Sequence, residues 1–436
     1  MKVGIIGCGY VFDHYLATWH DHPHLDIAGV FDRDPVRLAT VARAYRLRAY
    51  PSRAAMLADP AVRIVVNLTS VESHAEVTRA CLLAGKSVYS EKPLTTNLAE
   101  ARELVELARE RGLALSAAPS NALGDTAQTM WKAVQDGAVG AVRLVYAEFD
   151  DNPVYLMRPE TWRSRTGAPW PYLDEYAQGC THEHVGYHLT WLCAIFGPVA
   201  SVTAFSKQVL PDKTADAVDP PDTPDFSVAC LEFASGVVAR VTCSIGAPLD
   251  HRMRVVGDRG MISADTYRHY RCPVYVETFS SLTLNARKAM SVRRSSTLRR
   301  LFGVDGRRVR LVRNAPPGSS RPRRNRAMTP GALVRRWRQY ELGRQDKAIG
   351  VAELADALAN GREHFPPPEF TLHVTELTLA IQAAGRDAAP YRPTTTFKPL
   401  SPRPETLRAV RDFGPTRRDR AMTRLTEGLL TRLHRH

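Results

Sequence analysis

A glycine turn near the start of the chain has the residues that a dinucleotide phosphate requires. Gly7-Cys8-Gly9 directly follows an apolar run, Val3–Ile6, and leads into a helical stretch. In such a strand–turn–helix unit, the first glycine permits the tight turn. The second lets a pyrophosphate approach the backbone at the helix N-terminus. Phe12 stands where the G-x-G-x-x-G pattern has its third small residue, so the turn alone is weak evidence.

An acidic residue follows the turn at the distance that dinucleotide binding needs. Asp32 ends the second apolar run, about 20 residues after the turn, where a carboxylate accepts hydrogen bonds from the adenosine ribose. Its charge would also repel the 2′-phosphate of NADP. Arg33 and Arg37 could offset that repulsion. The sequence therefore favours NAD as the cofactor, with NADP the lesser candidate.

Two polar segments stand where later strands of the same region should end. Asn67–His74 begins at the end of the run Ile64–Leu68, and Ser90–Pro93 follows the run Ser87–Tyr89. Ligands of open α/β sheets bind outside the carboxyl ends of the strands. A lone lysine is ordinarily a solvated surface residue, but Lys92 stands at such an end and is a candidate site residue.

A cluster of histidines between Gly179 and His188 offers a proton acceptor that works near neutral pH. His184 and His188 are four residues apart and would share one face of a helix. Two other interpretations remain open: a structural histidine pair, and a zinc site built on His-x3-His, for which no third ligand is evident. His20, His22 and His24 fall in an expected loop and should face water. The sequence thus predicts no metal site.

Aromatic and arginine residues are dense between residues 155 and 176, just before these histidines. Aromatic faces and bidentate arginine hydrogen bonds suit a polyhydroxylated or phosphorylated ligand. A loop packed on its own domain is the competing interpretation. The candidate substrate-binding residues are Trp162, Arg163, Arg165, Trp170 and Tyr172.

The elements that would position these residues alternate as βα units over residues 1–119. Short apolar runs separated by helical patterns predict a doubly wound parallel sheet, a Rossmann domain. The expected strands are Val3–Ile6, Ile27–Phe31, Ile64–Leu68, Ser87–Tyr89 and Leu113–Ser116, and the expected helices include Pro35–Ala44, Ser73–Ala84 and Leu98–Arg111.

Residues 120–400 change to strand-like alternation and predict an α+β domain on a large, mostly antiparallel open sheet. A basic insertion at about 281–330 interrupts this domain, and residues 401–436 form a basic tail. The expected strands are Val142–Phe149, Val199–Ser206, Phe226–Phe233, Val237–Ser244 and Met253–Val256, and the expected helices are Thr126–Gln135, Ile349–Ala359 and Leu372–Ala384.

The bulk composition of the 436 residues fits a globular, cytoplasmic protein. Seven scattered cysteines form neither a CxxC motif nor a disulfide framework, and no apolar run approaches the ~18 residues of a membrane span. The net charge of +14 is local, because residues 287–326 alone carry +13. Clustered arginine can neutralise phosphates, but no aromatic residues interleave there for base stacking. Nucleic-acid binding is therefore not expected.

Several of these motifs together resemble the glucose–fructose oxidoreductase/inositol dehydrogenase (Gfo/Idh/MocA) family. That family combines a G-x-G Rossmann domain, a Glu-Lys-Pro motif and a C-terminal sheet domain with a catalytic histidine. The resemblance covers residues 1–280 and about 345–400. Its motifs are Gly7–Gly9, Glu91–Pro93, Asn121–Gly140, Gly257–Gly260, Gly350–Ala355 and Leu372–Glu376.

The resemblance also implies roles for single residues. Lys92 would contact the substrate hydroxyl and stabilise the developing alkoxide, and His188 would accept its proton. His184 stands where the family has an acid, and Trp191 where a second acid often follows, so the identity of the proton acceptor is open. The residues expected to bind the cofactor are Gly7, Gly9, Tyr10, Val11, Asp32, Arg33, Asn67, Thr69, His74, Glu91 and Lys92.

The sequence therefore predicts an NAD(P)-dependent oxidoreductase. It would transfer hydride to or from a secondary hydroxyl or carbonyl of a sugar, cyclitol or nucleotide-activated sugar, and we expect a homo-oligomer. The alternative is a catalytically silent or regulatory family member that binds the cofactor. Phe12 and His184 favour that alternative, whereas Lys92 and His188 oppose it.

Overall fold

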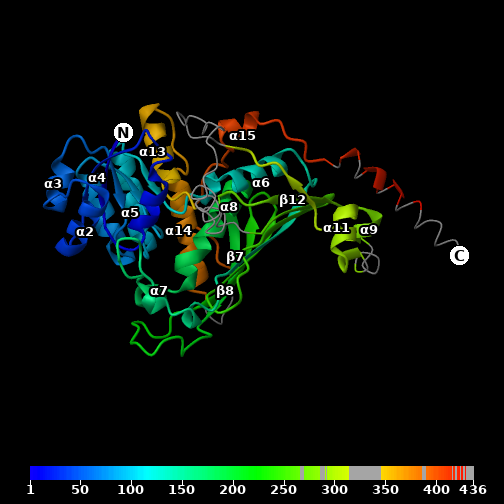
Figure 1. Cartoon of the computed structure of the whole chain (residues 1–436), viewed down its shortest axis with the longest axis horizontal. Helices are drawn as coiled ribbons and strands as arrows, with labels where there is room; N and C mark the ends of the chain where they lie inside the picture. Colours follow the sequence, from blue (N-terminus) through cyan, green and yellow to red (C-terminus); the bar gives the residue numbers. More distant parts are fainter. Residues whose placement is uncertain are drawn as a thin grey trace, which may run out of the picture.

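Parallel strands and covering helices alternate over the first 117 residues of the computed structural model (Figure 1). Five strands form one parallel sheet in the order β2-β1-β3-β4-β5. These are β1 (Lys2–Ile6), β2 (Asp26–Phe31), β3 (Ile64–Asn67), β4 (Ser87–Ser90) and β5 (Leu115–Ala117). The structure describes residues 1–265, 270–284, 290, 292–313, 345–384, 389–414, 416, 417, 420–422, 424, 425 and 428.

Side chains cap the N-termini of three helices of this domain. The Asp34 side chain accepts hydrogen bonds from the first turn of α2, whose first residue is Pro35, and Asn97 caps α5 in the same way. The helices are α1 (Phe12–Trp19), α2 (Pro35–Tyr45), α3 (Arg53–Ala58), α4 (His74–Leu83) and α5 (Leu98–Glu110). The order of the strands in the sheet changes direction between β1 and β3. In open α/β sheets, ligands bind at the carboxyl ends of the strands at such a point, here next to the turn after β1.

Eight strands form a second sheet in the order β13-β12-β11-β10-β6-β9-β8-β7. Among the described strands of this second sheet, the pairing is antiparallel except between β6 and β9, which are parallel. The strands are β6 (Val142–Asp150), β7 (Val199–Lys207), β8 (Phe226–Phe233), β9 (Val238–Ser244), β10 (Met253–Gly257), β11 (Gly260–Ala264), β12 (Val274–Thr278) and β13 (Arg307–Val309). The predicted fold class, a Rossmann domain followed by a mostly antiparallel α+β domain, is confirmed.

Helices from distant parts of the chain join the two domains (Figure 1). Helix α14 (Pro368–Gln382) contacts α5 and β5 on one side and α8 (Gly186–Phe196), β7 and β8 on the other. Helix α13 (Ile349–Ala359) contacts β4 and β5. The remaining helices are α6 (Asp125–Gln135), α7 (Tyr172–Gln178), α9 (Ser281–Leu284), α11 (Ser296–Phe302) and α15 (Pro404–Arg408). In the described part of the chain, every helix is too short or too polar to span a bilayer.

Part of the predicted basic insertion belongs to the folded domain. Strand β13 lies within residues 281–330 and pairs with β12 at the edge of the sheet. Val309 and Val312 are buried, and the Val312 amide donates a hydrogen bond to Thr129 Oγ1 (2.8 Å) in α6. Residues 314–330 of the predicted insertion lie outside the described residues.

We expect Val309→Ala and Val312→Ala each to lower the free energy of unfolding by about 1–3 kcal/mol, because each removes buried methyl groups. Val410→Ala, at a position that is 92% exposed, is the control and should have almost no effect. Urea denaturation of the three variants provides the measurement. Equal stabilities would show that this stretch does not pack against the domain in solution.

Candidate active site

The turn after β1 has the shape that a phosphate needs. Gly7 has a φ of +99°, and a Cβ there would lie 2.4 Å from the carbonyl oxygen of Leu68. Around Gly9, by contrast, a Cβ would meet no atom within 4 Å. Phe12 is fully buried and packs against Tyr45, with ring centroids 5.8 Å apart. The unusual third position therefore fills the core, and the turn is open at Gly9, as the approach of a pyrophosphate to the backbone requires.

Asp32 is held beside this turn by backbone amides. Its carboxylate accepts hydrogen bonds from the amides of Cys8 (2.6 Å) and Asp34 (2.8 Å). Arg33 is exposed, and Tyr10 and Val11 are half-buried at the start of α1. The Asp32 carboxylate and the open glycine turn beside it fit the adenosine end of a nicotinamide dinucleotide.

A loop of the second domain is fastened to the same turn by Thr166. Its amide and hydroxyl both donate to Asp13 Oδ2 (2.7 and 2.9 Å). The Arg37 guanidinium donates to the carbonyl and hydroxyl oxygens of Thr166 (3.0 and 2.9 Å) and to the carbonyl of Cys8 (2.8 Å). The Arg37 guanidinium therefore binds oxygens of the protein itself. The sequence did not predict these contacts.

The polar residues after β3 connect two strand ends. Asn67 is buried; its amide donates to His74 O and Thr78 Oγ1 (both 3.1 Å), and its carbonyl accepts from the Thr69 hydroxyl (2.7 Å). The ring nitrogens of His74 lie 2.7 Å from Pro93 O and 3.1 Å from Thr69 O. These three predicted cofactor residues therefore fix the loop after β3 to the loop that carries Lys92.

Lys92 forms a buried ion pair with Glu183 of the second domain. Burial by itself would raise the pKa of Glu183, but the Lys92 ammonium outweighs burial and holds it below its usual range. Burial opposes a charged Lys92 in the same way, yet Glu183 and Glu175 raise the pKa of Lys92 above its usual value. Both groups are therefore ionised, and a cation stands at the carboxyl edge of the Rossmann sheet.

The segment that carries Glu183 is a π-helical turn, Thr181–Val185, which continues into α8. Glu183 and Tyr187 lie four residues apart, and both interact with the charge of Lys92. The Tyr187 hydroxyl also receives a hydrogen bond from Lys347 (3.3 Å). The sequence did not predict Glu183, Tyr187 or Lys347 as site residues. The signal that could have indicated the first two is their Glu-x3-Tyr spacing, one position before the His-x3-His pair.

His184 and His188 share a face, as their spacing predicts, but that face is turned to the sheet. Their rings lie 4.7 and 5.9 Å from the ring of Phe149 in β6. His184 lies 3.8 Å from Asp151, and His188 is fully buried. Burial lowers the pKa of His188 to about 3, so its imidazole is neutral at pH 7. The described contacts of Lys92 involve neither histidine.

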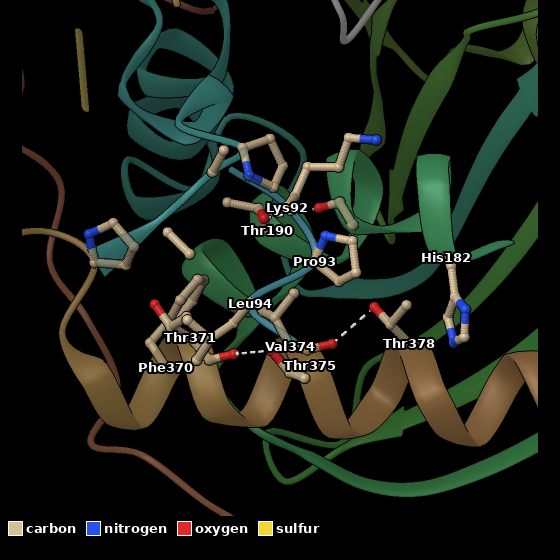
Figure 2. Close-up of a pocket in the computed structure, with 15 residues that line it drawn as sticks. Lys92, Pro93, Leu94, His182, Thr190, Phe370, Thr371, Val374, Thr375 and Thr378 are labelled. Carbon is tan, nitrogen blue, oxygen red and sulfur yellow. Dashed lines mark hydrogen bonds between the residues drawn. The ribbon is translucent and has the colours of Figure 1, made fainter. Parts of the chain in front are cut away.

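A small cavity of about 30 Å³ lies beneath Lys92, between the domains. Figure 2 shows it above α14, with Thr371, Thr375 and Thr378 on one wall and His182 at one end. The ammonium of Lys92 points away from this cavity. The cavity and the Lys92 ammonium therefore lie on opposite sides of the backbone at Lys92.

The predicted substrate residues form a loop with many internal contacts. Trp162 and Trp170 pack against each other with ring centroids 4.7 Å apart, and Arg163 donates to Glu160 O and Trp162 O. The Arg165 guanidinium lies 5.5 Å from the ring of Tyr45 in α2. The Tyr172 hydroxyl donates to Asp216 (2.6 Å). This geometry favours the interpretation of a packed loop for these five residues.

Two family models match the chain. Residues 1–118 match the oxidoreductase family with an NAD-binding Rossmann fold, and residues 127–263 match the GFO/IDH/MocA C-terminal domain. Trans-1,2-dihydrobenzene-1,2-diol dehydrogenase of Bos taurus is 27% identical over 267 residues, which cover 60% of this chain and 73% of that protein.

Solved structures share the fold at lower identity. The WlbA dehydrogenase from Bordetella pertussis, in complex with NADH and UDP-GlcNAcA, is 18% identical with a TM-score of 0.62, covering 90% of this chain and 97% of that chain. Aldose-aldose oxidoreductase from Caulobacter crescentus, complexed with glycerol, is also 18% identical, with a TM-score of 0.64 and coverage of 90% and 98%.

The two glycines of the turn should respond differently to alanine. Gly9→Ala meets no protein atom, so the free energy of unfolding should stay within ~0.5 kcal/mol of wild type. The methyl group would crowd the pyrophosphate, and NADH should bind about tenfold or more weakly. Gly7→Ala should destabilise the protein itself. Urea denaturation and NADH fluorescence titration separate the two effects. Unchanged NADH affinity in Gly9→Ala would mean that the dinucleotide does not use this turn.

Proposed function

The chain belongs to the Gfo/Idh/MocA family of oxidoreductases, and we propose that it transfers hydride between a bound nicotinamide dinucleotide and a secondary hydroxyl or carbonyl of a polyhydroxylated small molecule. One observation carries the proposal. The buried ammonium of Lys92 lies at the carboxyl edge of the Rossmann sheet, paired with Glu183 and within electrostatic reach of Tyr187. A cation and a proton-exchanging group at this edge are what alcohol oxidation requires.

Each protein group then has a defined task. When bound, the nicotinamide ring supplies the hydride-accepting or hydride-donating carbon. Lys92 donates a hydrogen bond to the substrate oxygen and stabilises its negative charge as the C–H bond breaks. Glu183 holds the Lys92 ammonium in place, and the Tyr187 oxygen accepts the hydroxyl proton in the oxidation direction.

Tyr187 is favoured over the predicted His188 because of where each side chain lies. Tyr187 is next to Lys347 and interacts with Lys92. Both rings are buried next to Phe149, with ring centroids 6.0 Å away for Tyr187 and 5.9 Å for His188, but it is the Tyr187 hydroxyl that reaches Lys347. His188 as proton acceptor therefore stays a prediction that mutagenesis can still decide.

A polyhydroxylated substrate is supported by the chemistry of the site and by the names of related proteins. The bovine relative is a dihydrodiol dehydrogenase, and the two structural neighbours hold a nucleotide-linked sugar acid and glycerol. Homo-oligomeric assembly and a cytoplasmic location stay predictions. A catalytically silent member is the alternative function; the charged Lys92–Glu183 pair beside Tyr187 argues against it.

The function is tested directly by turnover. Native mass spectrometry of the purified protein would identify a retained dinucleotide. Sugars, cyclitols, UDP-linked sugar acids and trans-dihydrodiols are then screened with NAD and NADP while the absorbance of the reduced cofactor is followed. The proposal expects turnover in at least one chemical class. Tight cofactor binding with no turnover across the panel would support the silent alternative.

On the substrate so identified, Lys92→Met should lower turnover by about 10²- to 10³-fold with little change in cofactor affinity. Tyr187→Phe removes only the hydroxyl and should cost about 10²- to 10⁴-fold. His188→Asn is the matched comparison: it should lower the free energy of unfolding but leave the turnover of the folded enzyme nearly unchanged. Loss of turnover in His188→Asn with an active Tyr187→Phe would restore the histidine prediction.

We further propose that the enzyme prefers NAD to NADP. Asp32 presents a carboxylate to the ribose site, and Arg37, which could neutralise a 2′-phosphate, is bound to Cys8 and Thr166. Fluorescence titration should therefore give tighter binding of NADH than of NADPH. Asp32→Ala should narrow that difference, whereas Asp26→Ala, at an exposed position in β2, should not. Tighter NADPH binding by the wild type would refute this preference and implicate Arg33.

A further inference from the structure

Lys347 brings a second ammonium into the active site from a part of the chain that neither family model matches. It immediately precedes Ala348 and α13, and only 13% of its side chain is exposed. Its Nζ lies 3.3 Å from Glu91 Oε1 and 3.3 Å from the Tyr187 hydroxyl. Lys347 therefore bridges the Glu-Lys-Pro segment and the helix that carries Tyr187.

The backbone around Lys347 is anchored to the Rossmann domain on both sides. Asp346 lies 2.9 Å from the buried ring of His22, and the Ala348 amide donates to Thr18 Oγ1 (3.3 Å). Ala348 itself is fully buried. These contacts fix the backbone position of Lys347. The fold therefore places the Lys347 side chain next to Tyr187.

The partner of Lys347 is a carboxylate that stays ionised. Glu91 is buried and accepts hydrogen bonds from the Tyr15 hydroxyl (2.9 Å) and the Lys92 amide (3.1 Å). Burial alone would raise the pKa of Glu91, but the ammonium groups of Lys347 and Lys92 lower it to about 2. An ionised Glu91 in turn favours the charged form of Lys347.

Charged and titratable groups surround Tyr187 from several elements. Two ion pairs lie near it, Lys92 with Glu183 and Lys347 with Glu91. The titratable groups of this network are Lys92, Glu183, Glu175, Glu91, Lys347, Asp346, Tyr15, Tyr89 and Tyr270. The Lys347 ammonium donates a hydrogen bond to the phenol oxygen of Tyr187 (3.3 Å), and a cationic donor stabilises negative charge on the oxygen that accepts from it.

We propose that Lys347 is a positioning residue of the reaction, which holds the Tyr187 oxygen toward the substrate and stabilises its phenolate form. This inference rests on the proposed function. In the oxidation direction, the Tyr187 oxygen would take the substrate O–H proton while a bound oxidised dinucleotide would accept hydride from the carbon that carries this oxygen, which leaves a C=O bond. Lys347 stays protonated, paired with Glu91, and its hydrogen bond stabilises the phenolate before the proton arrives.

The first test needs no substrate. The ultraviolet absorbance of tyrosinate is followed through an alkaline titration, and the wild-type curve minus the Tyr187→Phe curve isolates Tyr187. In a Lys347→Met background, the same difference should move to higher pH, and Lys347→Arg should keep it near the wild-type position. Lys86→Met is the matched control, because Lys86 is also buried but donates only to the carbonyls of Asp59 and Val62.

The second test uses the identified substrate. Lys347→Met should lower kcat by about 10- to 100-fold, the loss expected for one hydrogen bond to a charged group, with a smaller change in KM. The rising limb of the pH–rate profile should move to higher pH, and Lys347→Arg should recover most of the rate. Lys86→Met should leave that profile in place.

The outcomes separate the two hypotheses. If Lys347→Met leaves the Tyr187 titration where it is in wild type, the inference is overturned whatever the enzyme turns over. If the titration moves but Tyr187→Phe keeps full activity, Lys347 does act on Tyr187 and the proposed proton acceptor is wrong. Should Lys347→Met fail to fold, Lys347→Gln replaces it, because glutamine keeps a neutral hydrogen-bond donor on a side chain one atom shorter. The Tyr187 titration must then move to higher pH in Lys347→Gln.

Discussion

The buried pair of Lys92 and Glu183 is the interaction on which the rest of the site depends. One partner follows β4 of the Rossmann domain and the other belongs to the π-helical turn of the second domain. Removing two charges from water is costly, and only their mutual attraction offsets that cost. An apolar pair of the same volume would be at least as stable, so the pair is best explained by the need for a cation at this edge.

A second ion pair follows from the first. Glu91 lies next to Lys92 in the chain and is equally buried, so it needs a cation of its own, which Lys347 provides. Tyr187 then stands near two ion pairs that carry no net charge. A phenolate there would add one negative charge, which the hydrogen bond from the Lys347 ammonium would stabilise, whereas burial holds the imidazole of His188 neutral.

The sequence predicted what local patterns determine and missed what packing decides. The βα periodicity and the Gly7–Asp32 spacing predicted the Rossmann domain, and the resemblance to the Gfo/Idh/MocA family is confirmed by both family models. Strands β11 to β13 were not predicted, although β11 and β12 are as long as β10, and β13 lies among arginines. Helix α8 is buried on nearly every side, so no polar face indicated whether Glu183 and Tyr187 or His184 and His188 meet Lys92. Lys347 belongs to no motif.

The same ion pair also determines how the two domains can separate. Besides the packing of α14 against both, polar contacts join them at Thr166 beside the glycine turn and at Glu183 beside Lys92. Arg165 and Gly167, which flank Thr166, are exposed, so water can replace its hydrogen bonds as they break. Lys92 and Glu183 are much less exposed, with 16% and 5% of their side chains accessible, so parting them would leave two largely buried charges unpaired. Opening for cofactor exchange should therefore begin at Thr166, while the residues of the reaction stay assembled around Lys92.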